Sequence, residues 1–166
     1  NMWTIIKFDK QQLNFLKKDF SEKLDDKFKF YIPKLLIQKY KNNKLINKEI
    51  SLLGNYLLCF HEEFKDPKTL QKLKFSRGLE YFLNGFKQSQ KEINDFIHKC
   101  RNSENEKGFI SHNFYKLNIN SKYKFSTGPF ADTIFKIVNL QKDKIDILMG
   151  NIKTTIKRKR FLFNPI

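Results

Sequence analysis

Cysteine is scarce in this chain, and long apolar runs are missing from it. Only Cys59 and Cys100 occur among 166 residues, which is too few for a disulfide framework or a cysteine-ligated metal cluster. Cys59 lies in an apolar run and is expected in the core. No stretch approaches the roughly 20 apolar residues of a membrane span, and the first residues lack the apolar region of a signal peptide. We therefore expect a soluble intracellular protein without membrane contact.

Catalytic motifs are also missing. The histidines His61, His98 and His112 are far apart in the sequence, and no glycine-rich phosphate loop, H-E-x-x-H or C-x-x-C motif occurs. The run from His61 to Glu63 offers acid and base groups, but it directly follows a predicted strand and is expected to be a solvated turn. We predict that the protein is not an enzyme and needs no metal or cofactor.

Basic and aromatic residues are plentiful instead. Lys and Arg number 33 against 17 acidic residues, giving a net charge of +16, and 18 of the residues are Phe. This imbalance favours an anionic partner such as nucleic acid, although lysines also coat solvated faces without binding anything. The 40% apolar content is enough to build a core.

The first hundred residues predict alternating strands and helices. A strand is expected at 3–8, a helix capped by Asp9 at 9–25, and β structure at 28–40. Asn42 and Asn43 predict the turn of a basic hairpin that returns at 45–50. A buried strand follows at 56–60, a helix opening at Asp66 and Pro67, a strand at 79–83 and a helix at 89–100.

The composition then changes. Residues 101–113 are polar and lack periodicity, which indicates a linker, and residues beyond them predict short strands and no helix. We predict an α+β protein: an N-terminal α/β sandwich (an antiparallel sheet with flanking helices) over residues 2–100, the linker at 101–113, and a small all-β barrel over 114–166.

One stretch in the second half is especially informative. The strand around Tyr123 and Phe125 runs directly into a tight turn and a further strand at 134–140. The turn resembles the KOW motif of NusG-family transcription factors, and it consists of Gly128, Pro129, Phe130, Ala131 and Asp132. Earlier segments resemble the same family in order and spacing: Trp3-Thr-Ile-Ile, Tyr31-Ile-Pro, Asn55-Tyr-Leu and Arg77-Gly-Leu-Glu-Tyr-Phe.

The resemblance implies an interaction module, with an N-terminal NusG domain joined to an SH3-like KOW barrel. It implies a cytoplasmic, monomeric factor, associated with the nucleoid during transcription, that binds the clamp helices of RNA polymerase, modulates pausing, and acts in transcription elongation, termination and antitermination. The barrel of such a factor contacts a small-subunit ribosomal protein or Rho.

Carried over to this chain, the resemblance selects three groups of binding residues. Leu53, Tyr56 and Leu58 match the polymerase-binding patch, with Tyr56 and Leu58 predicted on one face of their strand; packing in the core is the alternative. Residues near non-template DNA or RNA are Lys39, Lys41, Lys44, Lys48 and Arg77. Met149 and Gly150 match the barrel's contact with the ribosomal protein or Rho, although Met149 also suits the barrel core.

Two other functions fit the same residues. The first is a specialised, operon-specific antiterminator of the RfaH type, but Thr69-Leu-Gln-Lys stands where that branch carries His-Thr-Thr-Thr. The β-type alternation of the C-terminal segment also predicts a stable barrel rather than the helical hairpin of that branch. The second is a KOW-type RNA- or ribosome-binding protein that does not contact polymerase.

Overall fold

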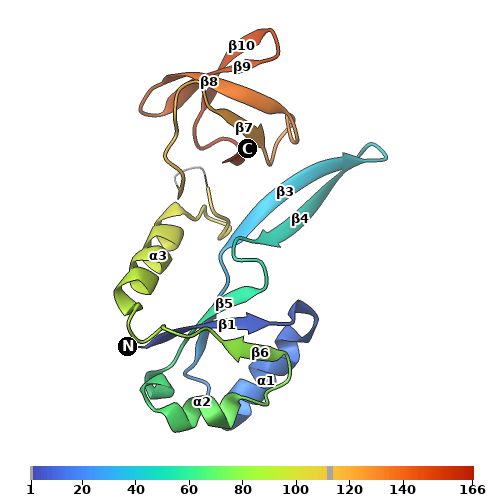
Figure 1. Cartoon of the computed structure of the whole chain (residues 1–166). Coiled ribbons are helices and arrows are strands. Elements are labelled where there is room, and N and C mark those ends of the chain that lie inside the picture. The colour runs from blue at the N-terminus through green and yellow to red at the C-terminus, as the bar shows by residue number, and fades with distance from the viewer. Residues whose placement is uncertain (1, 112–113) are drawn as a thin grey trace. The chain divides into compact units, whose positions relative to one another are not determined.

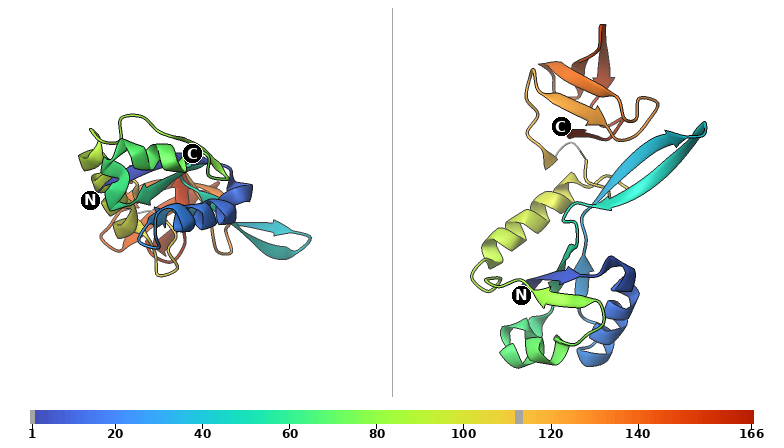
Figure 2. Two further views of the ribbon diagram at one scale, coloured as in Figure 1. Left: turned by 90° about the horizontal axis from the view of Figure 1, so that it is seen from below. Right: turned by 45° about the vertical axis from the view of Figure 1, so that its right-hand side comes forward.

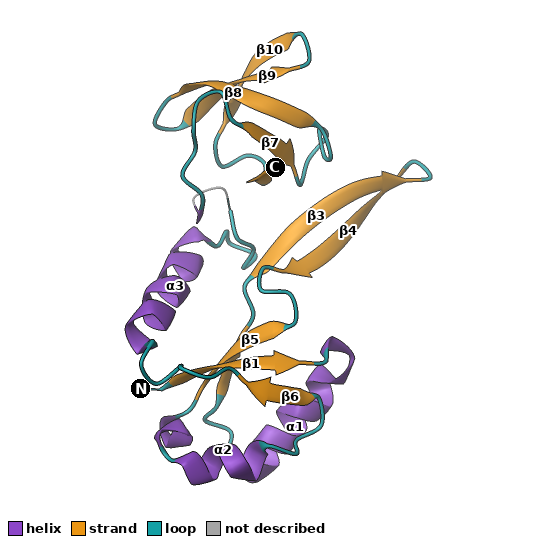
Figure 3. Cartoon of the chain, viewed as in Figure 1, coloured by secondary structure: helices purple, strands orange, loops and turns teal. Residues whose placement is uncertain are grey.

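The computed structural model describes residues 2–111 and 114–166, and Figures 1 and 3 show its strands and the helices α1, α2 and α3. Asn1 and the end of the predicted linker, His112 and Asn113, lie outside the described residues. The helical elements are η1 Lys10–Gln12, α1 Leu13–Lys23, η2 Glu62–Lys65, α2 Pro67–Leu73 and α3 Gln90–Ser103. The strands are β1 Trp3–Phe8, β2 Lys29–Tyr31, β3 Lys34–Lys41, β4 Lys44–Ser51, β5 Tyr56–Phe60, β6 Leu79–Phe82, β7 Lys122–Phe125, β8 Ile134–Leu140, β9 Lys144–Met149, β10 Ile152–Lys157 and β11 Phe163–Pro165.

The chain forms two compact units, and together they make the predicted α+β fold. The first contains residues 1–33 and 51–98, and the second contains residues 34–50 and 99–166. The β3–β4 hairpin is therefore grouped with the C-terminal strands, through bonds such as that from the Gln38 amide to the Ser126 carbonyl (2.5 Å). Helix α3 continues to Ser103, so the predicted linker begins inside a helix. The boundaries predicted at residues 100 and 114 stay a prediction.

The first unit is built on a four-stranded antiparallel sheet in the order β2-β5-β1-β6. Strand β1 pairs with β5 and β6, so that Lys7 lies opposite Tyr56 on one side and Tyr81 on the other. The interior position of β5 confirms the prediction from its continuous apolar run.

Among the described residues, no helix is long and apolar enough to cross a membrane.

Alternation along the central strands gives this sheet two separate cores. Leu57 and Cys59 face the first core, with α1 and α2, and Leu58 faces the second core, where α3 packs. Figure 2 shows the helices on opposite sides of the sheet. The first core contains Ile6, Phe8, Leu16, Phe20, Leu57, Cys59, Phe64 and Leu73, and the second contains Trp3, Leu58, Phe86, Ile93 and Ile97.

The local signals in the sequence form as expected. The Asp9 carboxylate accepts a hydrogen bond from the Gln11 amide, and Asp66 caps α2 ahead of Pro67 in the same way. Asn42 and Asn43 both have positive φ, as a tight hairpin turn requires. Phe75 lies beyond the end of α2 at Leu73 and is 86% exposed.

The second unit holds an antiparallel sheet in the order β10-β9-β8-β7-β11. Its inward side chains form a single core that consists of Tyr123, Phe125, Phe135, Ile137, Ile145, Ile147, Ile156 and Phe163. The predicted β fold of the C-terminal segment is thereby confirmed, since no residue of 116–166 is helical.

Gly128 is required at the turn between β7 and β8 for two reasons. Its φ is +85°, a left-handed conformation that favours glycine, and a Cβ there would overlap the ring of Phe161. Its amide donates to Gln38 Oε1 at 2.8 Å. Phe161 in turn packs on the barrel core, so the turn cannot shift freely to make room.

We predict that Gly128→Ala destabilises the second unit by about 3 kcal/mol, from left-handed strain plus overpacking. Gly150→Ala is the matched control, because Gly150 also has positive φ but open space around its Cα; its cost should be about 1 kcal/mol. Urea unfolding followed through the amide NMR signals of β7–β10 measures both. Equal losses in the two variants would show that the Phe161 contact contributes nothing.

Candidate functional site

An aromatic row crosses the uncovered part of the sheet in the first unit. Lys7 of β1 lies between Tyr56 of β5 and Tyr81 of β6, which are its direct neighbours in register. The two tyrosine hydroxyls are 3.0 Å apart, and Lys7 Nζ lies 5.6 Å from the Tyr81 ring centroid. With the partly buried Leu53 and the exposed Leu83, these residues define the open-face patch.

Hydrogen bonds fix the ionisation of this patch. Glu80 accepts from Lys7 Nζ at 3.2 Å, and this bond raises the pKa of Lys7. The hydrogen bond with Tyr56 raises the pKa of Tyr81. The patch therefore combines the ring surface of two tyrosines with hydrogen-bonding groups at its centre, where Lys7 is paired with Glu80.

The predicted polymerase-binding residues are thus only partly accessible. Tyr56 and Leu58 share one face of β5 as predicted, but Leu58 is 1% exposed. The expectation of an open face at Leu58 is wrong, because Ile93 and Ile97 of α3 pack in the same core. Lys7 and Tyr81 were not selected from the sequence, because the register that sets them beside Tyr56 is fixed only by the pairing of strands in the folded sheet.

The four hairpin lysines gather on one face. The Asn42–Asn43 turn sets Lys41 opposite Lys44, and the side-chain bond between Gln38 and Asn47 (2.8 Å) agrees with that register. Side chains alternate along each strand. Lys39, Lys41, Lys44 and Lys48 therefore share the basic hairpin face, and all four are exposed.

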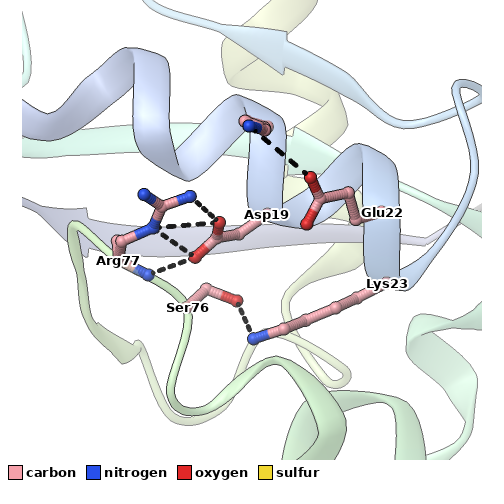
Figure 4. A network of polar contacts seen from close by, with 6 residues as sticks. Asp19, Glu22, Lys23, Ser76 and Arg77 are labelled. Atoms are coloured by element: carbon pink, nitrogen blue, oxygen red, sulfur yellow. Dashed lines mark hydrogen bonds and ion pairs between the residues drawn. The ribbon is translucent and has the colours of Figure 1, made fainter.

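Arg77, the fifth predicted nucleic-acid residue, is engaged inside the first unit. Its guanidinium donates to Asp19 of α1, with Nη2 2.6 Å from Oδ1, and its backbone amide donates to Oδ2 at 2.7 Å (Figure 4). The guanidinium also lies 4.6 Å from the Phe15 ring centroid. The contacts position the start of β6 against α1, and Asp19 compensates the charge that Arg77 would offer to a phosphate.

Asp19 is 7% exposed, and its hydrogen bonds from Arg77 lower the pKa of the carboxyl to about 2. Ser76 beside it accepts from Lys23 Nζ at 3.2 Å. The network joins residues 58 positions apart in the chain, which explains why no local pattern revealed it.

The KOW-type turn and the tip of β9 have different surroundings. Asp132 forms an ion pair with Lys124, with 3.4 Å between Oδ1 and Nζ. Phe130 is 39% exposed, and its ring contacts the rings of Phe125 and Phe161. Met149 packs partly against the barrel core, whereas Gly150 has open space around it. Ile152, directly opposite Met149 in register, is 64% exposed. Met149 and Ile152 therefore flank an exposed apolar tip.

His61 has a structural role. It is 4% exposed, its Nδ1 accepts from the Glu63 amide, and its Nε2 lies 3.0 Å from Asp25 Oδ1. It therefore caps η2 rather than facing solvent as predicted. Within residues 2–111 and 114–166, no group of three His, Cys, Asp or Glu side chains is arranged to hold a metal ion.

Comparisons with known proteins give only distant likenesses. No protein-family model matches the chain, and no curated protein matches it. It is similar to a solved structure of the MjSpt4:Spt5 complex, with 12% identity, coverage of 99% of this chain and 98% of that one, and a TM-score of 0.33. It is similar to a structure on domain interaction in Thermotoga maritima NusG, with 12% identity, coverage of 99% and 97%, and a TM-score of 0.35.

We predict that Asp19→Asn destabilises the first unit by about 2 kcal/mol at pH 7. Because folding lowers the Asp19 pKa from 3.8 to about 2, the unfolded chain binds the proton more readily. The stabilisation is therefore complete above about pH 4 and is lost as the pH falls through about 2. Urea unfolding followed by Trp3 fluorescence at several pH values measures it.

The control for this variant is Glu22→Gln on the same helix. Glu22 is in an exposed pair with Lys18, 3.9 Å apart, and such pairs contribute at most about 1 kcal/mol. A loss in Asp19→Asn no larger than in Glu22→Gln would contradict a structural role for the Asp19–Arg77 contact.

Proposed function

We propose that this protein is a transcription elongation factor that binds RNA polymerase through the open-face patch. The observation that carries the proposal is the aromatic row of Tyr56 and Tyr81 on the part of the sheet that α3 leaves uncovered. Aromatic side chains at the centre of a patch are typical anchors of protein interfaces. The sequence motifs shared with NusG-family factors supply the identity of the partner, namely the clamp helices of the polymerase.

The basic hairpin face supports a second contact, with nucleic acid. Exposed lysines near the tip of a hairpin contact phosphates without reading bases. Their contribution to binding is therefore electrostatic and independent of the nucleic-acid sequence. We propose that this face lies against the non-template DNA strand while the open-face patch holds the polymerase. In this arrangement the factor disfavours clamp opening and thereby modulates pausing.

The apolar tip of the second unit supports a further partner. Met149 is adaptable in shape, and Ile152 opposite it is exposed. We propose that the tip binds a small-subunit ribosomal protein or Rho, so that a cytoplasmic factor on polymerase holds that partner at raised local concentration.

We predict that Tyr56→Ala weakens binding to the organism's core RNA polymerase by at least about tenfold, since central aromatic anchors contribute 2 kcal/mol or more. Co-migration on a sizing column and titration by fluorescence anisotropy measure the effect. Phe75→Ala is the matched control: it removes an aromatic ring that is 86% exposed in the same unit but outside the patch, and binding should be unchanged.

Two results would contradict the proposal. One is an intact protein that fails to bind polymerase in moderate salt, which would favour the RNA- or ribosome-binding alternative. The other is an equal loss in both variants, which would show that binding does not depend on the open-face patch.

We predict that the double variant Lys41→Gln/Lys44→Gln lowers the salt dependence of single-stranded DNA binding. Each lysine that contacts a phosphate contributes about 0.7 to the slope of log affinity against log salt, so the slope should fall by up to about 1.4. Lys68→Gln/Lys72→Gln on the exposed side of α2 removes the same charge elsewhere. A slope that falls equally in both would assign the effect to net charge rather than to the basic hairpin face.

A further inference from the structure

A cleft of about 460 Å³ lies in the second unit, and its lining includes neither Met149 nor Ile152 of the apolar tip. Its walls come from the C-terminal part of α3, the segment that precedes β7, β7 itself, and the chain at the end of β11. The side chains that matter for its chemistry are Lys99, Phe114, Tyr115, Lys116, Lys122 and Tyr123. The volume is within the range of small-ligand sites.

The side chains that line this cleft carry a net positive charge. Three of its residues are lysines, and none of the residues lining it is Asp or Glu. Among the residues that the structure describes, neither Lys116 nor Lys122 takes part in an ion pair. Lys122 lies directly opposite Lys136 across β7 and β8. Like charges directly opposite each other on neighbouring strands repel and are destabilising. A bound anion would reduce this repulsion.

Aromatic rings form the other part of the wall. The rings of Phe114 and Tyr115 lie 5.3 Å apart at 84°, and both side chains are half-buried. Lys99 Nζ lies 4.4 Å from the Phe114 centroid. The wall therefore combines ring surface with cations at stacking distance, which is the combination that single-stranded nucleic-acid sites use.

Tyr123 adds a directed hydrogen-bond donor. Its ring is buried in the barrel core, and its hydroxyl accepts from the Asn118 amide at 2.9 Å. Within the described part of the chain no acceptor faces the hydroxyl hydrogen. A base or sugar oxygen in the cleft would supply that acceptor.

We infer that this cleft binds a nucleotide unit, with its base stacked on the Tyr115 ring and its phosphate on Lys116 and Lys122. The chemistry is shared by a free nucleotide and by one residue of a single strand. The basic hairpin face lacks this combination, because Ile37 and Ile46 are the apolar residues that alternation places among its lysines. The site is independent of the proposed binding to polymerase.

The test is an NMR titration of the full-length ¹⁵N-labelled protein with three probes: adenosine monophosphate, inorganic phosphate and an adenylate hexanucleotide. We expect the hexanucleotide to shift the amide signals of residues 116–123. Tyr115→Ala should weaken its binding by about tenfold through lost stacking. Lys122→Gln should weaken it and lower the salt slope by about 0.7.

Lys153→Gln is the matched control, because Lys153 is an exposed lysine on β10 of the same sheet. It should change the affinity by less than about twofold. Tyr115→Phe keeps the ring and should bind as the unchanged protein does. Lys122→Gln alters only an exposed side chain, so the test remains decisive even where Tyr115→Ala unfolds the barrel.

Shifts at 116–123 with monophosphate as well as hexanucleotide would support a free nucleotide as ligand, and shifts with the hexanucleotide alone would support a strand. The inference is overturned if these signals do not move, if Lys153→Gln and Lys122→Gln weaken binding equally, or if inorganic phosphate binds as tightly as the monophosphate. None of these results bears on the Tyr56→Ala experiment, so the two proposals fail separately.

Discussion

The alternation of side chains along β1 and β5 is the constraint on which the first unit depends. Both strands are interior to the sheet, and successive side chains along each strand point to opposite faces. The apolar side chains on both faces therefore need other elements packed over them. Helices α1 and α2 cover one face completely over Leu57 and Cys59. Helix α3 covers the other face around Trp3 and Leu58 and leaves Tyr56 and Tyr81 partly exposed. The proposed binding surface is the remainder of that second face.

The types of residue on this uncovered part of the sheet suit its partial exposure to water. Bare apolar side chains there would promote association of the free protein. The strands instead place Tyr56, Tyr81 and Lys7, whose polar atoms bond one another and Glu80 while their rings and methylenes remain available. A surface of this kind is stable in water and still offers area to a partner, because little rotamer freedom remains to be lost on binding.

Features coded by neighbouring residues could be predicted, and those made by distant contacts could not. The capping hydrogen bonds of Asp9 and Asp66 and the turn at the two hairpin asparagines involve residues close together in the sequence. The caps and the turn were therefore predicted correctly. The burial of Leu58 depends on α3, more than 30 residues later, and Arg77 is compensated by Asp19, 58 residues earlier. The alternation was visible in each strand separately, but the register that joins Tyr56, Lys7 and Tyr81 belongs to the folded sheet.

The distribution of positive charge is more informative than its sum of +16. Arg77 is bound to Asp19, and Lys7 to Glu80, so these cations serve the fold. The hairpin lysines and the lysines of the cleft are not compensated in this way, but their neighbours differ. On the basic hairpin face, alternation places the aliphatic residues Ile37 and Ile46 among the lysines, which suits contact with a phosphate backbone. In the cleft, lysines lie beside Phe114 and Tyr115, and a ring can stack on a base whatever its identity. One excess of charge thus serves two modes of recognition, and the aromatic residues decide between them.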